Sequence, residues 1–198
     1  MPIHVLASRL AQQNGDFEPQ RQDNFALEIV GLRGGQNDSD IITLSLATGF
    51  VPRLSHEEVA IPYGNSYVYV AGKMVWDAGN VVLRDWVDRN TADVVKQWQL
   101  QVGNPSTGQI GLARNYKKIA YVVLFGPNST GPETGEFATF ERQWQLVGAW
   151  PIAVNYSANT LDQSSSGQVM IEMTLRYDLA KSQFGQSGLL EQSPLAYS

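Results

Sequence analysis

The chain has 198 residues, a formal net charge of −5 and no cysteine. Its length suits one domain with an ordinary hydrophobic core, and the lack of cysteine excludes disulfides and thiolate chemistry. No basic cluster is present to hold nucleic acid by its phosphates, no apolar run approaches the roughly 20 residues of a membrane span, and the N-terminus lacks the layout of a signal peptide. We therefore expect a protein without a membrane anchor that folds in a cytoplasm.

The first part of the chain predicts a helix followed by strands. Helical spacing of apolar residues over 5–10 predicts a short N-terminal helix or arm. Alternating apolar residues predict a first strand over 25–29 and a second over 42–46, with a turn-rich loop over 31–39 between them.

The next loop, 48–55, is unusual because it carries Phe50, Val51, Pro52 and Leu54. Loops rarely bury their backbone, so apolar residues in a loop suggest contact with a neighbouring molecule. Folding of the loop onto the chain's own core is the alternative.

Two strands follow, over 59–63 and 67–70, and the second has no polar face. Tyr67 and Tyr69 lie on one side of it and valines on the other. A strand that is apolar on both sides is either central in a two-layer core or part of a subunit interface. A further strand is expected over 81–87.

The one convincing helix spans about 90–102. Asn90 is a suitable N-cap, Asp93 complements the N-terminal dipole, and Gly103 is a natural residue just past the C-terminus. One face of this helix is apolar, formed by Val94, Val95, Trp98 and Val102. A polar connection over 104–115 then leads to a strand over 119–125.

The last third of the chain predicts the main sheet. A long strand over 137–147 is expected to end at Pro151, which cannot donate to a ladder. Residues 168–177 alternate most cleanly, which indicates a strand with one dry face and another face that is either wet or covered by a partner. This other face includes Gln168, Glu172 and Thr174. We expect a single domain over 1–180 and an extended or mobile tail over 181–198.

Candidate catalytic residues are few. His4 and His56 are far apart and have no companions at metal-ligand spacing, so no metal or cofactor is expected. Asp85 and Asp88 could meet Glu141 in a glycosidase-like cleft, but solvated acidic residues explain them better. Phosphate-loop, dinucleotide and nucleophile-elbow motifs are absent. The residues alone therefore indicate a β-rich assembly module that is not an enzyme.

A series of short motifs resembles the tail tube proteins of contractile-tailed bacteriophages, the myovirus tail tube family. The resemblance covers roughly residues 15–180, and no single motif is specific. The motifs are, in order, GDFEP at 15–19, NFALEI at 24–29, ATGFVP at 47–52, VAIPYG at 59–64, VAGK at 70–73, WD at 76–77, VVLRD at 81–85, Trp98, NYKKIA at 115–120 and GAWPI at 148–152. The chain departs from the family in a longer connection over 104–114 and in the tail after Leu179.

The resemblance implies a mainly β protein, an antiparallel β-sandwich or barrel of the phage tail-tube type with one flanking helix. It further implies a homo-hexameric ring that stacks into the tail tube, the conduit for DNA ejection driven into the host envelope by sheath contraction. The implied inter-subunit and inter-ring contacts are Phe50, Val51, Pro52, Leu54, Tyr67 and Tyr69, and the possible lumen face holds Gln168, Glu172 and Thr174.

The implied partners are a tail sheath protein outside the tube, a tape-measure protein and then DNA in the lumen without specific binding, and baseplate and tail terminator proteins at the ends. The chain would be a virion protein assembled in the host cytoplasm. Three alternatives remain: a baseplate tube-initiator of the same fold, the tube protein of a bacterial injection system, and, from another class, a carbohydrate-binding sandwich or glycosidase.

Overall fold

A computed structural model describes residues 22–32, 36–88, 90–125, 140–157 and 166–184 of the chain. The expected N-terminal helix or arm over 5–10 and the residues after 184 lie outside the described residues.

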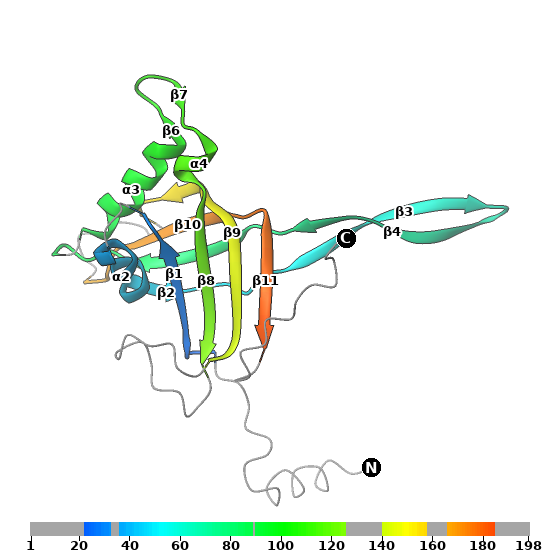
Figure 1. Ribbon diagram of the computed structural model, residues 1–198, viewed down its shortest axis with the longest axis horizontal. Coiled ribbons are helices and arrows are strands. Elements are labelled where there is room, and N and C mark those ends of the chain that lie inside the picture. Colours follow the sequence, from blue (N-terminus) through cyan, green and yellow to red (C-terminus); the bar gives the residue numbers. More distant parts are fainter. Residues whose placement is uncertain (1–21, 33–35, 89, 126–139, 158–165, 185–198) are drawn as a thin grey trace, which may run out of the picture.

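The described elements are mostly strands (Figure 1). Seven strands form the main sheet: β1 (Phe25–Val30), β2 (Leu46–Thr48), β5 (Gly79–Arg84), β8 (Lys118–Phe125), β9 (Phe140–Asn155), β10 (Met170–Arg176) and β11 (Leu179–Phe184). Two hairpins are built by β3 (Leu54–Tyr63) with β4 (Ser66–Trp76) and by β6 (Gly103–Asn104) with β7 (Gln109–Ile110). The helices are α2 (Gln36–Ser45), α3 (Thr91–Val102) and α4 (Ala113–Tyr116).

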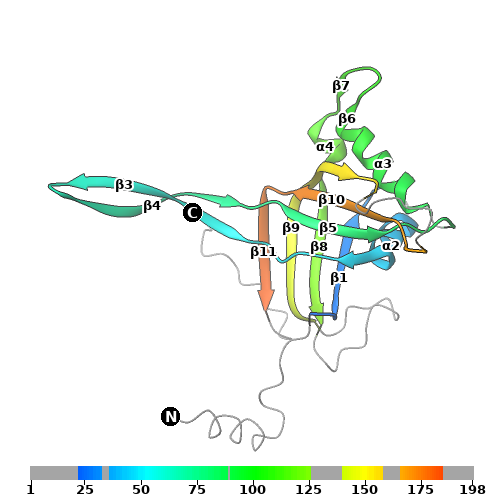
Figure 2. The same cartoon turned by 180° about the vertical axis from the view of Figure 1, so that it is seen from behind.

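The main sheet is antiparallel and curls into two layers. The front sheet holds β1, β8, the first part of β9 and β11, in that order. The rear sheet holds the last part of β9 with β10, β5 and β2. The strands of the two sheets cross at a steep angle in both views (Figures 1 and 2), so the fold is a curled half-barrel with short helices at its end.

Strand β9 joins the two layers and overturns one expectation. It does not end at Pro151 but continues to Asn155, because Gly148 adopts a left-handed backbone (φ 72°) that turns the strand from the front sheet into the rear sheet. Pro151 is tolerated because this part of β9 pairs only with β10 among the described strands and lies beside a register shift. Proline is found at such edge and bulge positions.

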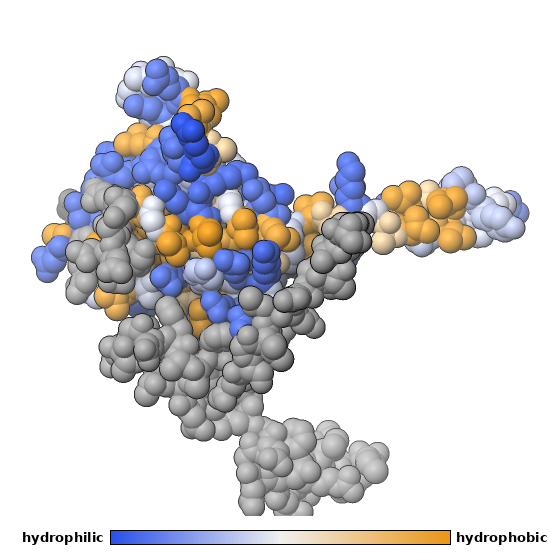
Figure 3. Space-filling model, viewed as in Figure 1, coloured by the Kyte–Doolittle hydropathy of each residue, from blue (hydrophilic) through white to orange (hydrophobic). Residues whose placement is uncertain are grey.

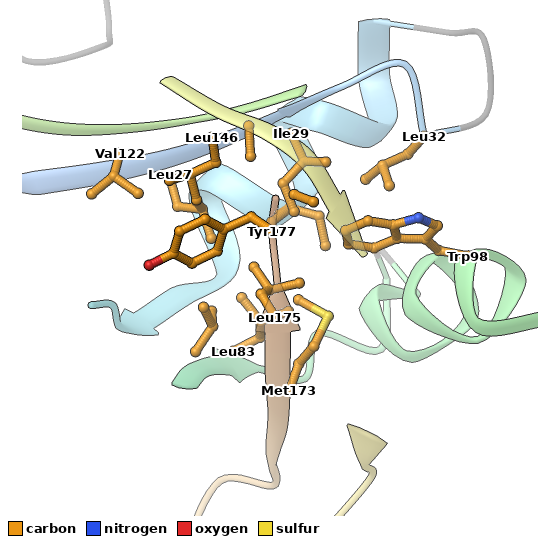
Figure 4. Packing of buried hydrophobic residues seen from close by; sticks show 14 of the residues in the cluster. Leu27, Ile29, Leu32, Leu83, Trp98, Val122, Leu146, Met173, Leu175 and Tyr177 are labelled. Carbon is orange, nitrogen blue, oxygen red and sulfur yellow. The ribbon is translucent and has the colours of Figure 1, made fainter. Parts of the chain in front are cut away.

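The core lies between the layers (Figure 4). The alternation expected over 168–177 is confirmed, since Ile171, Met173, Leu175 and Tyr177 are buried on one face of β10 and just after it. They pack against apolar residues of the front sheet and α3, which include Leu27, Ile29, Val122, Leu146 and Trp98.

Helix α2 replaces the strand expected over 42–46. Ile42 is buried and Leu44 is exposed, and only Leu46 of the alternating set belongs to a strand. Ser45 donates from Oγ to the Ile41 carbonyl at 2.6 Å, and Thr43 donates to the Leu27 carbonyl at 2.9 Å. Three alternating apolar residues were too short a pattern to separate a strand from a helix with one buried side.

Helix α3 confirms the expected helix over 90–102. Val94, Val95 and Trp98 are buried, and the indole of Trp98 donates to the Tyr116 carbonyl at 2.8 Å. The side chain of Asn90 makes no capping hydrogen bond, which differs from the expectation. Besides this flanking helix, the described residues form two further helices, α2 and α4.

Three boundaries differ from the sequence-based expectation. The strand expected over 81–87 ends at Arg84, and Val87 is 95% exposed. The connection over 104–115 contains the β6–β7 hairpin and α4 rather than only loop. Strand β11 pairs with β9 as far as Phe184, so the sheet continues beyond residue 180.

We expect Gly148→Ala to destabilise the fold. A Cβ at this position would collide with the Asp178 carboxylate, which accepts a hydrogen bond from Lys117 Nζ at 2.7 Å, and a left-handed backbone costs an L-residue about 1–2 kcal/mol. Gly108→Ala is the matched control, since Gly108 has a similar φ of 69° and open space around it. Urea unfolding should show a larger loss for Gly148→Ala; equal losses would contradict a role for the Asp178 contact.

Candidate functional site

The long hairpin of β3 and β4 leaves the body past the β11 side of the front sheet (Figures 1 and 2). Its strands pair from Leu54 opposite Trp76 to Tyr63 opposite Ser66, with one register shift after His56. Residues 56–71 are all exposed. The hairpin therefore has almost no contact with the other described residues along most of its length.

Both faces of the hairpin are apolar. The register places Val59, Val70, Ile61 and Val68 on one face, which we call the aliphatic face. The other, aromatic face carries Tyr67 opposite Pro62 and Tyr69 opposite Ala60. Tyr67 and Tyr69 are 63% and 62% exposed, and apolar colour covers much of the hairpin surface (Figure 3).

This exposure decides between the two interpretations of the strand over 67–70. The strand is not central in a two-layer core, because β4 pairs only with β3 among the described strands. An isolated two-stranded hairpin is marginally stable in water, and a contiguous apolar surface of this kind marks a protein interface. The described residues therefore leave both apolar faces of the hairpin exposed.

The root of the hairpin is anchored to the core. Phe50 stacks on Tyr177 with ring centroids 6.0 Å apart, and Trp76 contacts the same ring at 6.0 Å. Gly79 makes room for Phe50, since a Cβ there would collide with the phenyl ring. The alternative that the loop folds onto its own core therefore holds for Phe50, and the long hairpin begins only at Leu54.

Polar contacts also join the two sides of the hairpin at its root. The amide of Asp77 donates to the Arg53 carbonyl at 3.0 Å, and Ser55 Oγ donates to the Val75 carbonyl at 3.1 Å. Arg53 also forms an exposed ion pair with Asp77 at 3.4 Å, which contributes little to stability. Of the other predicted contact residues here, Val51 and Leu54 are exposed and Pro52 is half-buried.

The front sheet has a mixed outward face. The register aligns Val30, Ile119, Val147 and Leu179 in one row across its strands, and apolar side chains form a band across the body in Figure 3. A second row contains Glu28, Tyr121, Gln145 and Lys181. Nearer the other end of β8, Ala26, Val123 and Phe125 form a small buried cluster.

The outward face of the rear sheet carries the predicted lumen residues. Glu172 and Thr174 are half-buried on β10, and Thr174 Oγ1 donates to Asn80 Oδ1 at 2.9 Å. Gln168 is exposed just before the strand. The same face also carries Arg84 and Arg176, so it is not purely acidic or neutral.

A second projection was missed by sequence reasoning. Ile110 at the end of the β6–β7 hairpin is 85% exposed, and Leu112 and Leu100 beside it are also exposed. The sequence signal was the pair of apolar residues around Gly111 in an otherwise polar connection.

The described residues offer little for catalysis. No three His, Cys, Asp or Glu side chains gather as metal ligands in this part of the chain. His56 is exposed on β3 and Asp88 is exposed after β5, while His4 and the side chain of Glu141 lie outside what the structure describes. No helix within the described ranges has the length and apolarity to span a membrane.

Comparisons with known proteins identify the fold. No protein-family model matches the sequence, and no curated protein matches it significantly. The chain is similar to a chain in the cryo-EM structure of the sheath/tube terminator of PVC, an extracellular contractile injection system, in its extended state. The identity is 13%, the TM-score is 0.60, and the match covers 85% of this chain and 99% of that chain.

Two further solved structures are similar. The match to a chain of the anti-feeding prophage baseplate has 11% identity and a TM-score of 0.59, and covers 86% of this chain and 99% of that chain. The match to a chain of the PVC sheath–tube complex in its extended state has 13% identity and a TM-score of 0.56, and covers 90% of this chain and 97% of that chain. The expected fold class is confirmed: the chain has a mainly β, tail-tube-like fold.

We expect stability to fall at alkaline pH through Tyr177. Burial raises the pKa of its hydroxyl above the ordinary value of 10.0, and the backbone of Arg53 opposes this more weakly. The contribution of the neutral Tyr177 hydroxyl to the free energy of unfolding is therefore complete below about pH 10. It is lost as the pH rises through the higher pKa that Tyr177 has in the folded state. Unfolding free energies of Tyr177→Phe should decline less than those of the native chain between about pH 8 and about pH 11. The exposed Tyr63→Phe variant is the control; equal declines in all three proteins would contradict this role.

Proposed function

We propose that the chain is a structural subunit of a tube: six copies form a ring, and rings stack through the β3–β4 hairpin. The observation that carries this proposal is the hairpin, whose two apolar faces are exposed in the single chain. Identical copies can cover these apolar faces in every ring. A head-to-tail contact between copies repeats along the assembly, which either closes into a ring or extends as a filament. The tail-tube-like fold supports the same role.

The finer proposal is the tail tube of a contractile bacteriophage. A sheath would surround the tube, a tape-measure protein and then DNA would occupy its lumen, and baseplate and terminator proteins would bind its ends. The motifs that resemble phage tail tubes support this assignment, and the chain would be part of the virion after assembly in the host cytoplasm. Such a role requires no catalysis, cofactor or metal.

The net charge suits a conduit for DNA. Six copies of a chain at −5 would carry about −30 per ring, which disfavours adhesion of phosphate groups. We assign the lumen wall to the outward face of the rear sheet around Gln168, Glu172 and Thr174. The described residues of this face form no buried apolar cluster, unlike the front sheet with Ala26 and Val123. Arg84 on the same face donates to the Leu46 carbonyl at 3.3 Å.

A second candidate is an end component of such a tube. It is favoured by the similarity to chains from the PVC terminator and the anti-feeding prophage baseplate, with TM-scores of 0.60 and 0.59. Copy number per particle separates the two candidates, since a tube subunit occurs in many rings and an end component in one. A tube from an injection system would carry protein cargo instead of DNA, and the contents of purified particles test that.

Charges on the hairpin should abolish assembly without unfolding the chain. We expect Tyr67→Asp and Tyr69→Asp together to leave the thermal midpoint nearly unchanged, because both side chains are exposed in the monomer. Electron microscopy and sedimentation should then find monomers in place of rings or tubes. Val87→Asp, at an exposed apolar position outside the hairpin, should assemble normally. Tubes formed by the double variant would contradict the proposed role of the hairpin.

Lysines on the lumen wall should slow DNA passage. We expect Glu172→Lys and Thr174→Lys together to lower the DNA ejection rate of assembled particles, more strongly at low salt, because each lysine adds a phosphate contact. Gln145→Lys on the front sheet is the matched control and should leave the rate unchanged. A lower ejection rate for Gln145→Lys, with an unchanged rate for the double variant, would assign the channel to the front sheet. An unchanged rate in both variants would contradict passage of DNA along these faces.

A further inference from the structure

An apolar groove opens beside the front sheet, on the side that faces the rear layer. Its volume is about 440 Å³, within the range of about 300–1,000 Å³ that is typical of binding pockets. Phe25 of β1 and Val122 and Leu124 of β8 form one wall, and the connection after β2 forms the other with Phe50 and Val51. Gly49 permits the close fit of this connection to Phe25, since a Cβ there would come within 2.7 Å of the ring.

We propose that this groove is the binding site for the β3–β4 hairpin of a second copy of the chain. The inference rests on the proposed assembly and names the surface that receives the hairpin. The groove lies under β1 and β8, whereas the hairpin leaves the body past β11, at the opposite end of the front sheet (Figures 1 and 2). The projecting part of the hairpin and the groove are therefore different surfaces of one chain, as a head-to-tail contact requires.

The hairpin and the groove also lie in compatible layers. The hairpin continues from β2 and into β5, so it extends the layer of the rear sheet (Figure 2). The groove is the place where that layer leaves the inner side of β1 and β8 incompletely covered. A hairpin arriving from a neighbour in the rear layer would cover the inner side of the front sheet there.

The chemistry of the two surfaces matches. Residues 59–72 of the hairpin contain no charged side chain, and neither do the described residues that line the groove. Burial of these two surfaces against each other leaves no unpaired charge among them, and an unpaired buried charge is strongly destabilising. The aromatic face of the hairpin, with Tyr67 and Tyr69, provides large apolar side chains of the kind enriched at interface centres.

Cysteine crosslinking tests this contact, because the chain has no cysteine of its own. Val51→Cys at the groove is combined with Tyr67→Cys or with Tyr69→Cys in the hairpin, and the full-length protein is treated with a short bis-maleimide after assembly. We expect a ladder of covalent multimers on denaturing gels for these double variants and its loss in each single variant. Tyr67→Cys with Val87→Cys is the control, since Val87 is exposed and does not line the groove.

The outcomes separate this inference from the proposed function. Rings or tubes in electron micrographs without a ladder from either Val51 pair would overturn the groove assignment and leave the tube intact. That result would also follow if the chain's own N-terminal residues or a small apolar ligand filled the groove. A chain that stays monomeric under all conditions would contradict both. As a second measurement, Val51→Asp should weaken assembly at least about tenfold, because it places a charge in the contact, whereas Val87→Asp should not.

Discussion

The dominant constraint on this molecule is that a two-stranded hairpin cannot bury its own apolar side chains. In a larger sheet one face rests on a core, but β3 and β4 pair only with each other among the described strands. Their aliphatic and aromatic faces both point into solvent in the single chain. Because water-exposed apolar surface is unfavourable roughly in proportion to its area, the assembly proposed above would gain stability by covering both faces.

The body of the protein is built to hold that hairpin at a defined angle. Phe50, Trp76 and Tyr177 connect its root to the core, and Gly79 gives Phe50 the space to do so. Strand β9 then ties the two layers together, since one strand belongs to both sheets and bends at Gly148. The hairpin is consequently joined to the half-barrel by a packed aromatic root.

The fold resembles that of chains from the PVC contractile injection system and the anti-feeding prophage baseplate at identities of 11–13%. So few shared residues can specify one fold because the requirement is a pattern of buried and exposed positions, which many sequences satisfy. Assembly then depends on surfaces outside that pattern. In this chain the candidate surfaces under the proposed assembly are the hairpin, the groove beside Phe25 and Leu124, and the apolar row of the front sheet that includes Val30 and Leu179.

Local periodicity by itself determined much of the architecture. The alternation that ends at Tyr177, the apolar face of α3 and the unusual strand at Tyr67 and Tyr69 all follow from side-chain spacing of two or 3.6 residues, and the motif order indicated the tail-tube fold. Only the tertiary structure decided that the segment before Leu46 is helical, that β9 passes through Pro151 into a second sheet, and that Phe50 belongs to the core. It also formed the groove from residues about a hundred positions apart, such as Phe25 and Leu124. Such features depend on pairing between distant strands, and spacing along the chain carries no information about which distant segments meet.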